Sequence, residues 1–200
     1  MYNSIQKYLE DLLDNSLGIK AERKTQLDSL AEIIRESTTK ELIFICTHNS
    51  RRSHFAQVWM QVACEYLGLG AKVKTFSGGT EATALNPRTA AALSRVGFKV
   101  SLASGDNPLY QLSYHSELLP IEAFSKVYSH SVNPQSSFIA IMTCDEAAEA
   151  CPVVNGASKR FNLSYKDPKI ADDSPQEHRI YDERCQEIAH EMLYLAKKIK

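Results

Sequence analysis

The sequence lacks the features of several protein classes. Its formal net charge of -1 gives no electrostatic reason to bind nucleic acid or an anionic membrane. No apolar run approaches the ~20 residues that span a bilayer, and polar residues interrupt the N-terminus where a signal peptide needs an apolar stretch. Glycine and proline are scarce, at 8 and 7 residues, and 44% of the chain is hydrophobic, which argues against disorder. We therefore expect a cytoplasmic globular protein.

The cysteines do not have the pattern of a disulfide-stabilised protein. There are five, an odd number: Cys46, Cys64, Cys144, Cys151 and Cys185. In a cytosolic chain most such cysteines are small core residues, and this is our expectation for Cys64 and Cys185. The histidines and cysteines also lack the paired short spacing of zinc ligands, so we predict no metal site, and no cofactor is implied.

Hydrophobic periodicity divides the chain into an N-terminal helical extension, residues 1–38, and a larger domain, residues 39–200. Apolar residues at helical spacing predict two amphipathic helices in the extension, with a break at Leu17-Gly18. Nothing in these helices indicates chemistry. We expect them to serve packing or a dimer contact.

Short apolar runs typical of buried strands alternate with helical patterns in the larger domain. Strands are predicted at 41–46, 72–77, 137–143 and, more weakly, 160–164, and helices at 52–67, 87–96 and 176–198. This alternation predicts an α/β fold with a mainly parallel four-stranded sheet and helices on both faces. The segment 105–133 lacks a clear period, and we interpret it as an excursion with one short helix near 114–124.

A polar loop follows the first predicted strand, at the carboxyl end where parallel sheets bind their ligands. The free N–H groups at the start of the next helix favour an anion, and the same field favours the thiolate form of a cysteine held there. The planar fork of Arg52 matches two oxygens of a phosphate-like ligand. Ser50 or Ser53 can donate a hydrogen bond to the sulfur. The loop residues are Cys46, Thr47, His48, Asn49, Ser50, Arg51, Arg52 and Ser53.

This loop resembles the signature loop of the low-molecular-weight protein tyrosine phosphatases and of the thioredoxin-coupled arsenate reductases that share their fold. The resemblance covers about residues 40–200 and continues through Ser77-Gly78-Gly79-Thr80-Glu81, Asn86-Pro87 and Asp167-Pro168. It implies that Cys46 is the nucleophile, Arg52 the oxyanion clamp and Asp167 the general acid. A leaving oxygen needs such a proton donor.

The loop departs from the family pattern at two positions. His48 stands where the family usually has glycine, so we expect a strained or altered backbone angle there. Arg51 replaces the cysteine that usually precedes the arginine, and we expect its positive charge to favour the thiolate further. Some reductases of this fold bind potassium, but Gln57 stands where a glutamate would be needed, so the ion is not predicted.

Two further cysteines distinguish a reductase from a phosphatase. Cys144 and Cys151 lie seven positions apart, directly after a buried strand. By the resemblance, Cys144 would attack the adduct of arsenic with Cys46, and Cys151 would then pair with Cys144, with thioredoxin as the reductant. In a regular helix the two would lie ~10 Å apart, too far for a disulfide without unwinding.

Two alternatives stay open. If Cys144 and Cys151 are only core residues, the protein is a phosphatase of phosphotyrosine or another phosphoester. Such phosphatases usually carry aromatic residues directly after Asp-Pro, and none follows Asp167-Pro168, although Tyr165, Tyr110, Tyr114 or Tyr128 can substitute. The other alternative is a non-catalytic module that binds an anion or a partner. We expect arsenate or a phosphate ester as substrate, and neither nucleic acid nor a membrane as partner.

Overall fold

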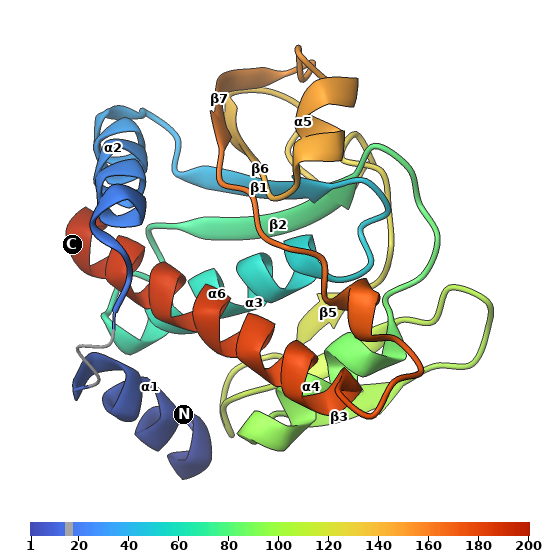
Figure 1. Cartoon of the computed structure of the whole chain (residues 1–200). Coiled ribbons are helices and arrows are strands. Elements are labelled where there is room, and N and C mark those ends of the chain that lie inside the picture. Colours follow the sequence, from blue (N-terminus) through green and yellow to red (C-terminus); the bar gives the residue numbers. More distant parts are fainter. Residues whose placement is uncertain (15–17) are drawn as a thin grey trace.

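A four-stranded parallel sheet lies at the centre of the computed structural model, which describes residues 1–14 and 18–200 (Figure 1). Its strands, in spatial order, are β2 (Lys74–Gly79), β1 (Glu41–Cys46), β6 (Phe138–Met142) and β7 (Ala157–Asn162). β1 and β6 pair in the middle of the sheet, from Leu42 with Ile139 to Ile45 with Met142. Because these strands are parallel, the loops that follow them leave the sheet at the same edge. The predicted four-stranded α/β fold is confirmed, although β7 begins earlier than predicted.

The central strands are buried on both faces, as their uninterrupted apolar sequences require. In β1, Leu42 and Phe44 belong to one hydrophobic cluster, whereas Ile43 and Ile45 belong to a second cluster on the opposite face. This alternation follows from the two-residue period of a strand. The second cluster also contains Cys46, so the chemistry proposed below lies on that face.

The larger cluster lies on the side of the sheet where most of the helices pack, against the sheet or against one another (Figure 1). These are α1 (Asn3–Asp14), α2 (Ala21–Glu36), α3 (Arg52–Tyr66), α4 (Pro87–Val96) and α6 (Glu177–Ile199). The short helix α5 (Asp145–Ala150) lies against the opposite face, and a 3-10 turn, η1 (Pro168–Ala171), precedes α6. Within the described ranges, no helix is long and apolar enough to cross a bilayer.

The two predicted N-terminal helices are present, and their apolar faces join the same cluster as α3 and α6. Ile5 and Leu9 of α1, and Leu27 and Leu30 of α2, are fully buried. Of the predicted break between them, Leu17 lies outside the described residues. The N-terminal extension is therefore part of the main hydrophobic core.

The expected helix near residues 114–124 is wrong. A three-stranded antiparallel sheet lies there instead, formed by β3 (Lys99–Leu102), β4 (Tyr110–Ser113) and β5 (Ile121–Ala123). Alternate residues of β4 and β5 are buried, so the segment has the two-residue period of strands, over too few residues to be recognised. The chain after β5 returns to the central sheet, where Val127 forms a bridge with Gly79.

Replacing Gly79 by alanine is expected to lower the free energy of unfolding by about 1–3 kcal/mol, because added atoms strain a packed site. An added Cβ would lie 2.7 Å from the Thr47 carbonyl oxygen and 2.8 Å from the Asn49 nitrogen, and closer still to the Glu81 carbonyl oxygen. These are backbone atoms, which cannot rotate away. Urea unfolding measures the change; an unchanged midpoint would show that the loop after β1 yields freely.

Candidate active site

The Cys46 side chain lies at the end of β1, at the entrance to the loop that precedes α3. Its Sγ is 3.1 Å from the Ser53 hydroxyl. The Asn49 side-chain amide donates to the same Ser53 oxygen at 2.9 Å, so the Ser53 hydroxyl hydrogen is free to point to the sulfur. Ser50 instead donates to the Ala84 carbonyl at 2.7 Å, and of the two predicted serines only Ser53 reaches the sulfur.

Residues after β5 hold the loop from outside. The Ser125 hydroxyl donates to the His48 carbonyl at 2.8 Å, and the Lys126 backbone N–H donates to the Asn49 side-chain oxygen at 3.0 Å. The positive φ falls on Asn49, at 45°, and not on His48, so the expected strain at His48 is wrong. Asparagine tolerates this conformation better than most residues. His48 is exposed and lies 3.7 Å from Glu81.

The Arg52 guanidinium is the centre of a polar network at the start of α3. It is 7% exposed. One nitrogen lies 2.8 Å from Oδ2 of Asp167, and the other donates to the Tyr165 carbonyl at 3.2 Å and lies 3.5 Å from Glu146 of α5. The predicted clamp and the predicted acid are therefore in direct contact, although Asp167 is 115 residues further along the chain. A short η1 turn, capped by the Asp167 side chain through the Lys169 N–H at 3.0 Å, presents the carboxylate.

Arg51 turns away from the sulfur. Its Nε donates to the Tyr181 hydroxyl at 2.7 Å, and a second nitrogen donates to Asp172 at 2.9 Å. Tyr181 in turn donates to Asp172 at 2.8 Å, which closes a three-membered network. Because Asp172 neutralises this guanidinium, we revise the expectation that the charge of Arg51 acts on Cys46. The Arg51 side chain instead ties the loop to the segment that follows Asp167.

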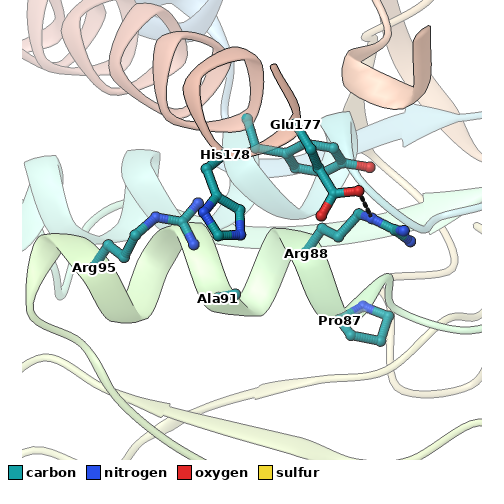
Figure 2. A pocket seen from close by; sticks show the side chains of 7 residues that line it. Pro87, Arg88, Ala91, Arg95, Glu177 and His178 are labelled. Atoms are coloured by element: carbon teal, nitrogen blue, oxygen red, sulfur yellow. Dashed lines mark ion pairs between the residues drawn. The ribbon is translucent and has the colours of Figure 1, made fainter. Parts of the chain in front are cut away.

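A pocket of about 170 Å³ between α4 and α6 lies beside the same network (Figure 2). Arg88 of α4 pairs with Glu177 at 2.6 Å and with Asp173 at 2.6 Å, as Figure 2 shows for Glu177. Tyr181 lines this pocket and also contacts Arg51. Arg51 and Arg88 thus hold the segment between Asp167 and α6 from two sides.

Cys144 and Cys151 flank α5, as its N-cap and C-cap residues. Cys144 is fully buried in the cluster that contains Cys46, and its Sγ lies 3.5 Å from the Thr47 hydroxyl. Burial raises the pKa of Cys144, an effect that the Thr47 hydroxyl and the Arg52 charge oppose. Cys151 is partly exposed, and its carbonyl accepts from Arg160 at 3.1 Å. The structure thus brings Cys46 and Cys144 to neighbouring strand ends.

The tyrosines that were considered as substitutes for the missing aromatic residues are largely enclosed. Tyr165, Tyr110 and Tyr114 are 5%, 4% and 3% exposed, and Tyr128 packs against the cluster that contains Cys46. Shortly after Asp167-Pro168, the large exposed hydrophobic side chain is Ile170, at 90% exposure. Among the described residues, no group of three or more His, Cys, Asp or Glu is arranged to hold a metal ion.

His54 lies behind the loop and is fully buried. Its Nε2 donates to the Asn49 carbonyl at 2.9 Å, and Nδ1 accepts from Ser77 at 3.4 Å. Burial, followed by the charge of Lys126, lowers the pKa of His54 to about 3. Burial also lowers the pKa of Lys126, to about 8. The imidazole is therefore neutral at physiological pH and supports the loop as a hydrogen-bonding group.

The pH dependence of stability should report this buried imidazole. Between the unfolded value of about 6.5 and the folded pKa of about 3, the unfolded chain binds a proton that the folded chain does not. Stability therefore falls as the pH falls through this window, with a slope approaching about 1.4 kcal/mol per pH unit. The slope is obtained from urea unfolding between pH 4 and 7, with an unfolding midpoint measured about every half pH unit. The slope should shrink in His54→Gln and persist in His178→Gln, an exposed control; equal slopes in both would contradict the assignment.

Sequence reasoning did not find Ser125, Lys126, Tyr181 or Asp172. Ser125 and Lys126 contact the loop across a sequence separation of 77 residues. The acidic pair Asp172-Asp173, shortly after the Asp-Pro turn, was a signal that the segment needs a basic partner, and the charge of Arg51 was assigned to Cys46 instead. The two facts together could have suggested their pairing.

Comparisons with known proteins agree with this geometry. A sequence profile of the family described as low molecular weight phosphotyrosine protein phosphatase matches residues 41–108. The arsenate reductase of Bacillus subtilis (strain 168) is 28% identical over 148 residues, which cover 74% of this chain and 88% of that protein. The arsenate reductase of Halalkalibacterium halodurans is 27% identical over 149 residues, covering 72% and 88%. Among solved structures, the low molecular weight protein tyrosine phosphatase from T. tengcongensis superposes with a TM-score of 0.56 at 16% identity, covering 80% of this chain and 99% of its own.

Proposed function

We propose that the chain reduces arsenate through a relay of Cys46, Cys144 and Cys151. Its similarity to the low-molecular-weight protein tyrosine phosphatases and to arsenate reductases supports this proposal. The chain is an enzyme of one of these two types. The proposal chooses the reductase, with Arg52 as the oxyanion clamp, Asp167 as the proton donor and a dithiol protein of the thioredoxin type as reductant. We expect it to act in the cytoplasm.

The observation that supports the relay most directly is the position of Cys144. The strands β1 and β6 pair up to Ile45 and Met142, and the Thr143 N–H donates to the Ile45 carbonyl at 2.7 Å. Cys144 therefore emerges next to the loop, where its sulfur contacts Thr47, the residue after Cys46. A core cysteine with no role would not need to lie beside the nucleophile.

In the first step, the Cys46 thiolate attacks the arsenic atom of arsenate. An As–S bond forms and the bond from arsenic to a hydroxyl group breaks, and that hydroxyl takes a proton from Asp167 and leaves as water. The Arg52 guanidinium donates to two of the remaining oxygens, whose negative charge the N–H groups at the start of α3 also stabilise. A phosphate ester would react in the same way and leave phosphocysteine.

In the second step, Cys144 loses its proton and attacks Sγ of Cys46. An S–S bond forms, the As–S bond breaks, and its electron pair stays with arsenic, which leaves as arsenite. Two sulfurs have then been oxidised by one electron each. Cys151 attacks Sγ of Cys144, which releases Cys46 as a thiolate and leaves a Cys144–Cys151 disulfide. The external dithiol reduces that disulfide and is itself oxidised.

The enclosure of Tyr165, Tyr110 and Tyr114 favours a small substrate over phosphotyrosine. The three enclosed tyrosines cannot sandwich a substrate ring unless the structure rearranges. An inorganic oxyanion needs only the loop, Arg52 and Asp167. Both substrates would undergo the same first step at Cys46.

The proposal is tested by arsenate-dependent oxidation of NADPH in the presence of thioredoxin and thioredoxin reductase. We expect turnover in the wild type, and a Cys144–Cys151 disulfide by mass spectrometry after a single turnover. No NADPH oxidation, together with aryl phosphate hydrolysis that survives Cys144→Ser, would assign the chain to the phosphatases instead.

Cys151→Ser should stop the relay after one turnover. Cys144 then has no partner, so the Cys46–Cys144 disulfide accumulates and about one arsenite is released per protein molecule. Arsenite release is measured in a rapid-quench experiment, and the disulfide is mapped by mass spectrometry. Cys64→Ser is the control, because this buried cysteine lies on α3 away from the relay, and it should retain full turnover. Sustained turnover of Cys151→Ser would exclude Cys151 from the relay.

A further inference from the structure

Arg23 of the N-terminal extension reaches the segment that leads to Asp167. Its guanidinium forms a two-pronged ion pair with Glu191 of α6, with both distances at 3.0 Å. Another nitrogen donates to the Ser164 carbonyl at 3.0 Å, and the guanidinium lies over the Tyr165 ring, 4.7 Å from its centroid. One side chain from α2 thus joins α6 to the chain between β7 and Asp167.

The segment that Arg23 holds is hydrogen-bonded to Arg52 and to the chain on either side of Cys144. The Tyr165 carbonyl accepts from Arg52 at 3.2 Å, and the Tyr165 N–H donates to the Thr143 carbonyl at 3.1 Å. Ser164 is hydrogen-bonded to Asp145, the first residue of α5. A shift of this segment would therefore move the partners of Arg52, and Asp167 two residues further on.

The contacts of Arg23 are shielded from water, which makes them specific. Glu191 is 4% exposed and Tyr165 is 5% exposed. Removal of the guanidinium leaves the Glu191 carboxylate buried without its partner and one face of the Tyr165 ring uncovered. The burial of Tyr165 also raises its pKa well above the usual value, so the ring stays neutral.

We propose that Arg23 is a positioning residue of the active site, and that the N-terminal extension serves to fix the segment 163–167 and, through it, Arg52 and Asp167. Arg23 lies before the residues 41–108 that match the family profile. The inference rests on the proposed function for its meaning in catalysis. Its effect on anion binding can be measured without turnover.

The test is protection of Cys46 from iodoacetamide by inorganic arsenate, followed by mass spectrometry of the Cys46 peptide, in the full chain carrying Cys144→Ser so that no disulfide with Cys46 can form. We compare Arg23→Ala and Arg23→Lys with Arg35→Ala. Arg35 is the matched control, because it also lies on α2 and also donates to α6, at the Lys198 carbonyl, 2.6 Å away. Thermal unfolding of each variant measures the purely structural effect.

We expect the arsenate concentration for half protection to rise about tenfold in Arg23→Ala, because a displaced Arg52 no longer fits the anion. It should rise about threefold in Arg23→Lys, whose ammonium can pair with Glu191 but cannot also reach Ser164 and cover the ring. Arg35→Ala should need the same arsenate concentration for half protection as the wild type, even if its melting temperature falls as much as that of Arg23→Ala. If Arg23→Ala does not fold, Arg23→Lys decides.

Half protection at the wild-type concentration in the folded Arg23 variants would overturn the inference and leave the proposed function intact. So would an equal loss in Arg35→Ala, which would mean that affinity merely follows stability. The reverse case is also distinguishable. Loss of protection in the Arg23 variants, in a wild type that reduces no arsenate, would support Arg23 as a positioning residue and reject the reductase.

Discussion

Cys46→Ser is expected to lower arsenate reduction and aryl phosphate hydrolysis by at least about 10⁴-fold, because a serine hydroxyl is not ionised near neutral pH and is a poor nucleophile without a base. The loop would still bind the anion, since Arg52 and the N–H groups of α3 are unchanged. Steady-state turnover measures the loss, and protection from proteolysis or a shift of the melting temperature by arsenate measures retained binding.

Two buried cysteines outside the relay, Cys64 and Cys185, provide the control for this substitution. Burial raises the pKa of both Cys64 and Cys185 to about 12, so neither thiol is reactive at neutral pH. Cys185 accepts from the Trp59 indole at 3.2 Å, a role that a serine oxygen can also fill. Cys185→Ser should therefore keep wild-type turnover. If Cys46→Ser kept more than about a hundredth of the wild-type activity, Cys46 would be excluded as the nucleophile.

Arg52→Lys should lower kcat/KM by about 10²–10³-fold although it conserves the charge. A lysine ammonium cannot bind two oxyanion oxygens in parallel while it also donates to the Tyr165 carbonyl. The half-saturating arsenate concentration should rise as well, because ground-state binding uses the same fork. Both parameters are obtained from initial rates over a range of arsenate concentrations.

Arg95→Lys is the matched control for Arg52→Lys. Arg95 lies on α4 and forms a two-pronged pair with Asp182, with Nε 2.9 Å and 3.1 Å from the two oxygens, away from the loop of Cys46. We expect a change of less than about twofold, as is usual for an exposed pair. Near-equal kcat/KM values for the two variants would mean that the guanidinium of Arg52 does not bind two oxygens of the oxyanion.

The sequence alone predicted the parts of the fold whose signals are local. The strands β1 and β6 are uninterrupted apolar runs, and α4 begins at Asn86-Pro87 and ends before a glycine, as predicted. The loop of Cys46 could be found because its residues are contiguous. Asp167 was found only by resemblance, since an Asp-Pro pair is by itself a common turn.

Other parts could not be predicted because their signals are distributed over the chain. The strands β4 and β5 have 4 and 3 residues, too few for a two-residue period to stand out. The partners of Arg51 and Arg23 are 121 and 168 residues away, and only the folded chain brings them together. His48 and Arg51 were interpreted from the loop alone, which is why both expectations needed correction.

The sulfur of Cys144 also accepts the Ala147 N–H at 3.4 Å, so the first turn of α5 is capped by the atom that would become oxidised. At the other end, Arg160 donates to the Ala148 and Cys151 carbonyls at 2.6 Å and 3.1 Å. Bond formation with Cys46 would draw this sulfur towards the loop and leave the six-residue helix without its N-terminal acceptor. A helix this short has little stability of its own, so it would open at that moment and bring Cys151 within reach. The order of the two disulfides would then be set by helix stability: the second pairing becomes accessible only once the first exists.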